Sequence, residues 1–253
     1  MNETFYVGID FSLNSTGICI EYKNQNYFLS FFNECKFNHK KKNFDFYKEL
    51  ESKPLLNELF LDTNNVKLCL RKQEPLPKPK TIGINVWGQK QMDIVKTYTD
   101  FIISNFFSKL IEFGWNEKTK VIIGIENYSY DSFGDATIQI IEMTSVLKQK
   151  LLDFCELENT HIIPAPTIKK KYSVGGNANK FDMFKSYLDL GLKDKFSLFV
   201  KNNENSLYKE KWKLTSKGKA QNHEVLSPVD DLIDSYFIKE YVKYYLKGQD
   251  NFQ

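Results

Sequence analysis

Four acidic residues of the 253-residue chain form a set with no histidine or cysteine in it: Asp10, Glu126, Asp231 and Asp234. Each lies at the end of a predicted strand or in the first turns of a predicted helix. Carboxylate oxygens are hard ligands of the kind that Mg²⁺ and Mn²⁺ prefer. Converging carboxylates repel one another without cations. With two bound ions they can activate a water molecule and stabilise the leaving oxygen in phosphodiester hydrolysis.

The first two acids each close a predicted strand, and each follows a glycine by two residues. Because side chains alternate along a strand, Gly8 shares a face with Asp10, and Gly124 shares a face with Glu126. A glycine inside a strand leaves space beside the acid for a cation, a phosphate or the end of a packed helix. Taken singly, either acid is better explained as the start of a solvated loop.

The other two acids belong to a predicted helix start. Ser227 is expected as N-cap, Pro228 as the first helical residue and Asp230 as N3, which is a capping-box arrangement. Asp231 and Asp234 then stack on one helix face. The helix dipole favours an acid at Asp231. Asp234 lies one turn further in among apolar residues, where a carboxylate is costly unless it is paired or binds a metal.

The strand and helix patterns that must position these acids predict an α/β fold. Three short strands separated by polar turns come first and indicate an antiparallel meander. Units of helix and apolar strand follow, which favours parallel pairing and helices on the faces of the sheet. The expected fold is a five-stranded mixed sheet flanked by helices. The expected strands span residues 4–10, 16–22, 27–32, 120–126 and 161–164, and the expected helices span 89–113, 136–157, 179–190 and 228–246.

The domain organisation is expected to be simple. A chain of this length can bury a proper core, so we expect one domain over residues 1–253. Residues 34–88 have an irregular pattern with alternating prolines, and we expect an insertion there. A polar, lysine-rich stretch at 191–222 is expected to be an extension.

The net charge of +3 conceals an uneven distribution. Residues 169–219 hold 13 lysines and five acids, a net charge of +8, so the rest of the chain carries −5. Such a segment suits an anionic partner, although a solvated lysine-rich loop explains it equally well. Because Arg71 is the only arginine, phosphate contacts would come mainly from lysine ammonium groups and backbone amides.

Composition argues against several classes of protein. An aromatic content of 15% argues against wholesale disorder. The longest apolar run near a strand, residues 121–125, is far too short to cross a bilayer, and the first residues have no signal-peptide pattern. The four cysteines are widely spaced, which fits reduced thiols. We therefore expect a cytoplasmic protein, in a bacterial host cell or another cytosol.

Four segments resemble the RuvC-type Holliday junction resolvases of the ribonuclease H-like superfamily. Residues 7–17 (VGIDFSLNSTG) resemble the family's first strand and turn, and residues 123–126 (IGIE) match its second acidic strand. Ile168-Lys169, followed by residues 175–180 (GGNANK), resembles its two-lysine, glycine-containing segment. Residues 231–234 (DLID) match its closing D-x-x-D. The resemblance covers the first 33 residues and most of 89–246. Separately, the lysine-rich composition points to an AT-rich genome, such as that of a phage or virus, because lysine codons are rich in adenine.

The resemblance implies a ribonuclease H-like fold, a homodimer, and Mg²⁺-dependent cuts placed symmetrically on a four-way DNA junction, with Mn²⁺ as a substitute. It assigns metal binding and catalysis to the four acids. Lys169 or Lys180 would stabilise charge that develops at the scissile phosphate. Lys169, Lys170, Lys171 and Lys180 are expected to contact DNA. The family places an aromatic residue shortly after the second acid. Here Tyr128 and Tyr130 flank Ser129, and either tyrosine can stack on a base.

Three other functions fit parts of the same pattern. A nuclease that acts on forks, flaps and branched DNA in general is the strongest alternative, because the two extra segments lie where specificity could be modified. A DNA-binding protein without catalysis would use only the basic segment. Residues 8–17 also resemble the phosphate-binding hairpin of actin-like ATPases, but that fold needs a second such domain and a second glycine-rich motif, which the sequence lacks.

Overall fold

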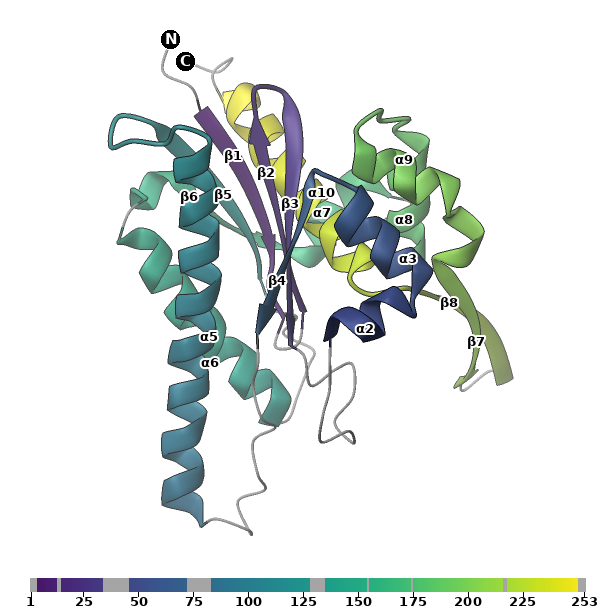
Figure 1. Ribbon diagram of the computed structural model, residues 1–253, viewed down its shortest axis with the longest axis horizontal. Helices are drawn as coiled ribbons and strands as arrows, with labels where there is room; N and C mark the ends of the chain where they lie inside the picture. Colours follow the sequence, from purple (N-terminus) through teal and green to yellow (C-terminus); the bar gives the residue numbers. More distant parts are fainter. Residues whose placement is uncertain are drawn as a thin grey trace.

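The structure is a computed structural model (Figure 1) that describes residues 4–12, 15–33, 46–71, 83–127, 135–153, 155–173, 175–215 and 218–249. The described strands are β1 (Thr4–Asp10), β2 (Ser15–Tyr22), β3 (Gln25–Asn33), β4 (Val66–Arg71), β5 (Lys120–Asn127), β6 (Thr160–Pro164), β7 (Tyr208–Thr215) and β8 (Gly218–Val225). The described helices are α2 (Phe46–Glu51), α3 (Pro54–Asn57), η1 (Glu58–Asp62), α5 (Ile84–Glu112), α6 (Asp135–Leu152), η2 (Leu157–Asn159), α7 (Ala165–Tyr172), α8 (Lys180–Asp189), α9 (Lys195–Asn202), η3 (Glu204–Ser206) and α10 (Val229–Gln249).

The main sheet of the described residues is mixed, with the strand order β4-β3-β2-β1-β5-β6. β1, β2 and β3 form the predicted antiparallel meander, and β5 and β6 continue the sheet in parallel with β1. The mixed α/β fold with flanking helices is therefore confirmed. The expected number of five strands is wrong, because β4 lies within 34–88 and adds a sixth strand parallel to β3. The single-domain organisation stays a prediction.

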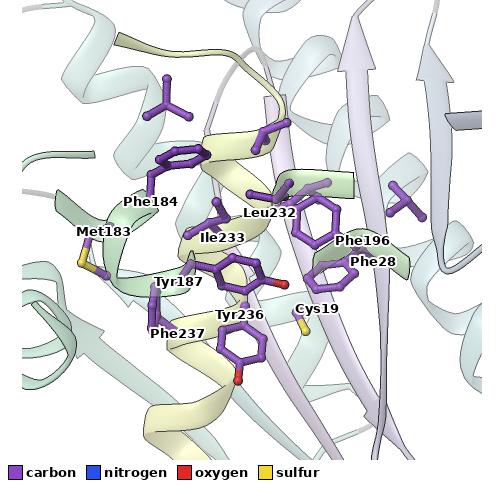
Figure 2. Packing of buried hydrophobic residues seen from close by; sticks show 14 of the residues in the cluster. Cys19, Phe28, Met183, Phe184, Tyr187, Phe196, Leu232, Ile233, Tyr236 and Phe237 are labelled. Atoms are coloured by element: carbon purple, nitrogen blue, oxygen red, sulfur yellow. The ribbon is translucent and has the colours of Figure 1, made fainter. Parts of the chain in front are cut away.

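Helices cover both faces of the sheet (Figure 1). On one face, α5 and α6 bury a cluster that includes Val7, Ile9 and Ile123 from the central strands. On the other face, α10 crosses the sheet with α8 and α9 packed beyond it. Figure 2 shows that second core, where Tyr187 and Phe196 meet Leu232 and Phe237 of α10. These two layers fix α10 relative to the strand ends.

Helix α10 packs directly on the backbone of the sheet because glycines face it. A Cβ atom built on Gly8 would lie 2.0 Å from the carbonyl oxygen of Ser235, and one on Gly17 would lie 2.3 Å from that of Asp231. No side chain larger than hydrogen fits at either position. The space beside the strand acids was expected to hold a cation, a phosphate or the end of a packed helix. The structure places a helix there, and this helix carries Asp231 and Asp234.

A buried ammonium group fixes the position of α10 along the sheet. Lys239 is fully buried, and its Nζ lies 2.9 Å from Oε2 of Glu21 and 2.9 Å from Oδ1 of Asn26. Glu240 also pairs with it. A buried charge is tolerated only with such partners. Since Glu21 and Asn26 belong to the β2–β3 hairpin region, the ion pair ties the helix to the meander.

The lysine-rich stretch expected at 191–222 has regular structure where it is described. It forms α9, η3, β7 and most of β8, and β7 pairs with β8 as an antiparallel hairpin. The hairpin projects away from the main sheet (Figure 1). Among the described residues, no helix is long and apolar enough to cross a membrane.

Candidate active site

The four predicted acids line one small pocket, which we call the carboxylate pocket. Its volume is about 150 Å³. Asp10, Glu126, Asp231 and Asp234 contribute to its wall together with Ser12, Lys169 and Lys180. Asp10 and Asp231 are buried, with exposed fractions of 9% and 6%. The structure therefore brings together six of the residues selected from the sequence.

The convergence follows from the order of the strands. β1 and β5 are parallel neighbours, paired from Thr4–Lys120 to Ile9–Ile125, so their carboxyl ends meet at one edge of the sheet. Asp10 and Glu126 lie at this edge. The N-terminal turns of α10 come to the same edge because Gly17, which pairs with Asp10, lets the backbone at Asp231 approach closely. β6 ends there too, and α7 follows it directly with Lys169.

Lys180 pairs with the acids in the first turns of α10. Its Nζ lies 2.6 Å from Oδ2 of Asp230, 3.1 Å from Oδ1 of Asp231 and 3.8 Å from Oδ2 of Asp234. Lys180 begins α8, whose start is fixed by a capping box between Asn179 and Asp182. The capping box therefore positions the ammonium group over the carboxylates.

Burial and mutual repulsion favour the protonated forms of these acids. Burial, with the charge of Glu126, raises the pKa of Asp10 well above its usual range. Burial also raises the pKa of Glu126, and a hydrogen bond between the Glu126 and Asp10 side chains requires a proton on one of them. The pKa of Asp234 is raised to about 8, chiefly by burial. Burial alone lowers the pKa of Lys180, but the charges of Asp231 and Asp230 outweigh it and raise the net value.

Hydroxyl groups orient Asp231 from the side opposite to Lys180. The hydroxyl groups of Ser15 and Ser227 both donate to Oδ2 of Asp231, the latter at 3.2 Å. The predicted capping box at Ser227 is wrong, because α10 begins at Val229 and Asp230 pairs with Lys180 instead. Ser15 and Ser227 are therefore site residues that were not predicted from the sequence. The only sequence signal for these contacts is that Ser227 lies four residues before Asp231.

Ser15→Ala tests this orientation. Removing one of the two hydroxyl donors lets the Asp231 carboxylate rotate. If Asp231 binds a metal ion as predicted, losing such an outer partner typically costs about 10–100-fold in metal affinity or activity. We expect the Mg²⁺ concentration for half-maximal cleavage to rise by roughly tenfold or more. Ser145→Ala, on the exposed face of α6, is the matched control. An unchanged Mg²⁺ requirement in Ser15→Ala would show that Asp231 does not depend on this contact.

The remaining predicted residues lie elsewhere. Lys170 and Lys171 are exposed on the last turn of α7 and do not line the carboxylate pocket. Nζ of Lys171 lies 3.8 Å from the ring centroid of Tyr244. Tyr128 and Tyr130 lie outside the described residues, so their predicted stacking on bases stays a prediction.

The chemistry of the pocket fits a hard divalent cation. The acidic side chains of the pocket offer carboxylate oxygens as metal ligands. Oδ1 of Asp230 is buried beside them without a hydrogen-bond partner in the described structure. In the arrangement described, no three histidine, cysteine or acidic side chains already form a metal-binding group. Lys180 instead supplies the positive charge that these acids require.

Comparisons with known proteins find similarity at the level of structure. No protein-family model and no curated protein matches the chain. Among solved structures, the chain is similar to the RuvC structure of Thermus thermophilus, with a TM-score of 0.43, 9% sequence identity and coverage of 96% of each chain. At this TM-score and identity, the similarity assigns no function to the chain.

Proposed function

We propose that the chain is a divalent-metal-dependent endonuclease that cuts branched DNA, chiefly four-way junctions. The observation that supports this most is the meeting of Asp10, Glu126, Asp231 and Asp234 in one pocket with Lys169 and Lys180 at its wall. Carboxylates beside ammonium groups suit a phosphate that must be held while a charge develops on it. The resemblance of the same residues to RuvC-type resolvases gives the choice of substrate.

In this proposal the four acids hold Mg²⁺, which when bound supplies an activated water and stabilises the leaving oxygen. Ser15 and Ser227 keep the Asp231 carboxylate in one orientation. Lys180 turns from the acids to the scissile phosphate and neutralises its charge, while Lys169 holds the DNA backbone. Burial of Asp10 against β2 and α10 keeps bulk water away from that carboxylate.

The basic segment supports a polyanionic substrate. Residues 169–219 include both pocket lysines and carry a net charge of +8. Binding that relies on lysine–phosphate pairs is strongly salt-dependent, because counterions are released. Symmetric cuts on a four-way junction require two active sites, so we propose that the chain acts as a homodimer. Sedimentation should then give a particle mass twice the 29.7 kDa of the chain.

The decisive experiment compares synthetic four-way junctions, forks, flaps and linear duplex with Mg²⁺, Mn²⁺ or EDTA. We expect Mg²⁺-dependent cutting of the junction, at least tenfold faster than that of the duplex. Glu126→Gln should abolish cutting, while Glu117→Gln, an exposed control after α5, should cut at the wild-type rate. Equal cutting of junction and duplex would refute the resolvase proposal, and cutting in EDTA would refute the metal requirement.

A further inference from the structure

A second, larger cavity adjoins the carboxylate pocket, and we call it the α3–β8 groove. Its volume is about 1120 Å³, and it lies between α3, the start of β7, the end of β8 and the start of α8. Lys180 lines both cavities, and Asp230 in the groove wall is the neighbour of Asp231 in the pocket. A strand whose phosphate lies at the carboxylate pocket therefore reaches the groove within a short length of chain.

The floor of the groove is mainly apolar. Leu55 and Leu56 of α3 face Leu207 and Val225 at the base of the hairpin. Two rings, Tyr208 and His223, also line it. They are held by Phe181, which stacks on His223 with ring centroids 4.2 Å apart and meets Tyr208 edge-on at 4.8 Å. Fixed rings in an apolar floor suit the flat face of a nucleobase, which stacks on them irrespective of its identity.

The lysines and acids that line the groove have a net charge of +1, from three lysines and two acids. Lys53, Lys180 and Lys209 line its rim, against Glu224 and Asp230, and Asp230 is already paired with Lys180. In the sequence that follows Lys209, residues 210–219 contain four further lysines and one glutamate. An apolar floor with lysines at its rim is complementary to a strand that presents bases inward and phosphates outward.

We propose that the α3–β8 groove binds an unpaired segment of a branched DNA, a single-stranded arm that extends from the phosphate held at the carboxylate pocket. A fully paired duplex presents sugars and phosphates rather than base faces, so it does not complement the apolar floor. The volume exceeds the roughly 300–1,000 Å³ of ordinary small-ligand sites, which leaves room for more than one nucleotide. This inference rests on the proposed function and adds a preference for branches that carry unpaired nucleotides.

The test measures binding in Ca²⁺, without cleavage, to a fully paired four-way junction and to the same junction with one arm left single-stranded. The readout is the ratio of the two affinities. We expect the wild type to favour the single-stranded arm, and Tyr208→Ala to lower the ratio by about fivefold or more, as loss of one stacking platform does. Tyr245→Ala, at the exposed end of α10, should leave the ratio unchanged.

Two further measurements do not depend on the folding of Tyr208→Ala. A 2-aminopurine base in the unpaired arm should lose fluorescence when it stacks in the groove of the wild-type protein. Lys209→Glu, an exposed substitution at the rim, should weaken binding of an oligothymidine several-fold, whereas Lys201→Glu on α9 should weaken it less. The proposal would be overturned if Tyr208→Ala had the same affinity ratio as the wild type and the 2-aminopurine fluorescence were not quenched. An apolar protein segment would then be the occupant of the groove.

Failure of the groove and failure of the nuclease are distinguishable. If the wild type cuts paired junctions but shows no preference for the unpaired arm, the groove proposal is wrong and the nuclease stands. If it binds oligothymidine through Tyr208 and Lys209 but cuts no DNA with Mg²⁺, the groove stands and the proposed activity is wrong.

Discussion

Asp10→Asn should abolish cleavage and, without divalent ions, raise the melting temperature at pH 8. Asp10 is buried among Glu126, Asp231 and Asp234, so its ionised form is disfavoured in the folded chain. Asparagine removes that cost but cannot hold a cation as a carboxylate does. We expect cleavage to fall by about 10²–10³-fold or more, the range for losing one preorganised electrostatic group. The melting temperature should rise by roughly 2–4 °C per kcal/mol gained.

The sign of the pH dependence follows from the raised pKa values. Asp234, with a pKa of about 8 in the folded chain, keeps its proton there over a range where the unfolded chain, near 3.8, has lost it. Folding therefore takes up a proton between about pH 4 and pH 8, and stability without metal falls as the pH rises through that window. Asp10 acts in the same direction. Mg²⁺ should stabilise the wild type more at pH 8 than at pH 5.

Thermal melts at pH 5 and pH 8, with EDTA or Mg²⁺, check this prediction. Asp10→Asn should show a smaller fall in stability toward pH 8, because the contribution of Asp234 remains, and should lose most of the Mg²⁺ response. Asp189→Asn, exposed at the end of α8, should melt like the wild type under all four conditions. A variant Asp10→Asn that is less stable than the wild type at pH 8 in EDTA would show that Asp10 is not held at a cost.

Gly17→Ala should damage both the fold and the site. The new Cβ would lie 2.3 Å from the Asp231 carbonyl oxygen and 2.6 Å from its carbonyl carbon, and these backbone atoms cannot rotate away. Helix α10 must move outward and take Asp231 and Asp234 with it. A displacement of about 1 Å at reacting groups can cost 100-fold in rate, and overpacking costs about 1–3 kcal/mol of stability.

The matched control is Gly88→Ala on α5. Apart from the neighbouring residues and the backbone of the same helix, no atom of the described structure lies within 4 Å of a Cβ at that position. Alanine should therefore stabilise the helix by about 0.5–1 kcal/mol. Cleavage rates on a four-way junction and urea unfolding separate the two glycines. Full activity of Gly17→Ala with normal stability would mean that the close contact between β2 and α10 is not required.

The candidate site was largely predictable from the sequence because its acids lie at strand ends. The β-branched and aromatic residues of 4–10 and the apolar run 121–125 predict two strands strongly. Because these strands are parallel neighbours, they bring Asp10 and Glu126 to one edge of the sheet. The glycine two residues before each acid indicated that something approaches closely. Whether that was a cation, a phosphate or a helix depends on long-range packing, which the local pattern does not contain.

The strands that were not predicted from the sequence, β4 and β7, have weak strand patterns. In β4 only Val66 and Cys69 are buried, so polar positions dilute the strand signal. In β7 lysines at 209, 211 and 213 alternate with other residues, and this high charge favours a loop interpretation. The Ser15–Asp231 contact joins positions 216 residues apart, which a single sequence cannot reveal.

The buried ion pair of Lys239 bears on when the site forms during folding. Its ammonium group and the Glu21 carboxylate that receives it are 218 residues apart in the sequence. Burying that ammonium before Glu21 and Asn26 are in place would cost several kcal/mol, so α10 docks only onto a finished β2–β3 hairpin. Asp231 and Asp234, which α10 carries, therefore reach Asp10 and Glu126 only after that hairpin has formed. On this reasoning the carboxylate pocket is completed last, when α10 docks.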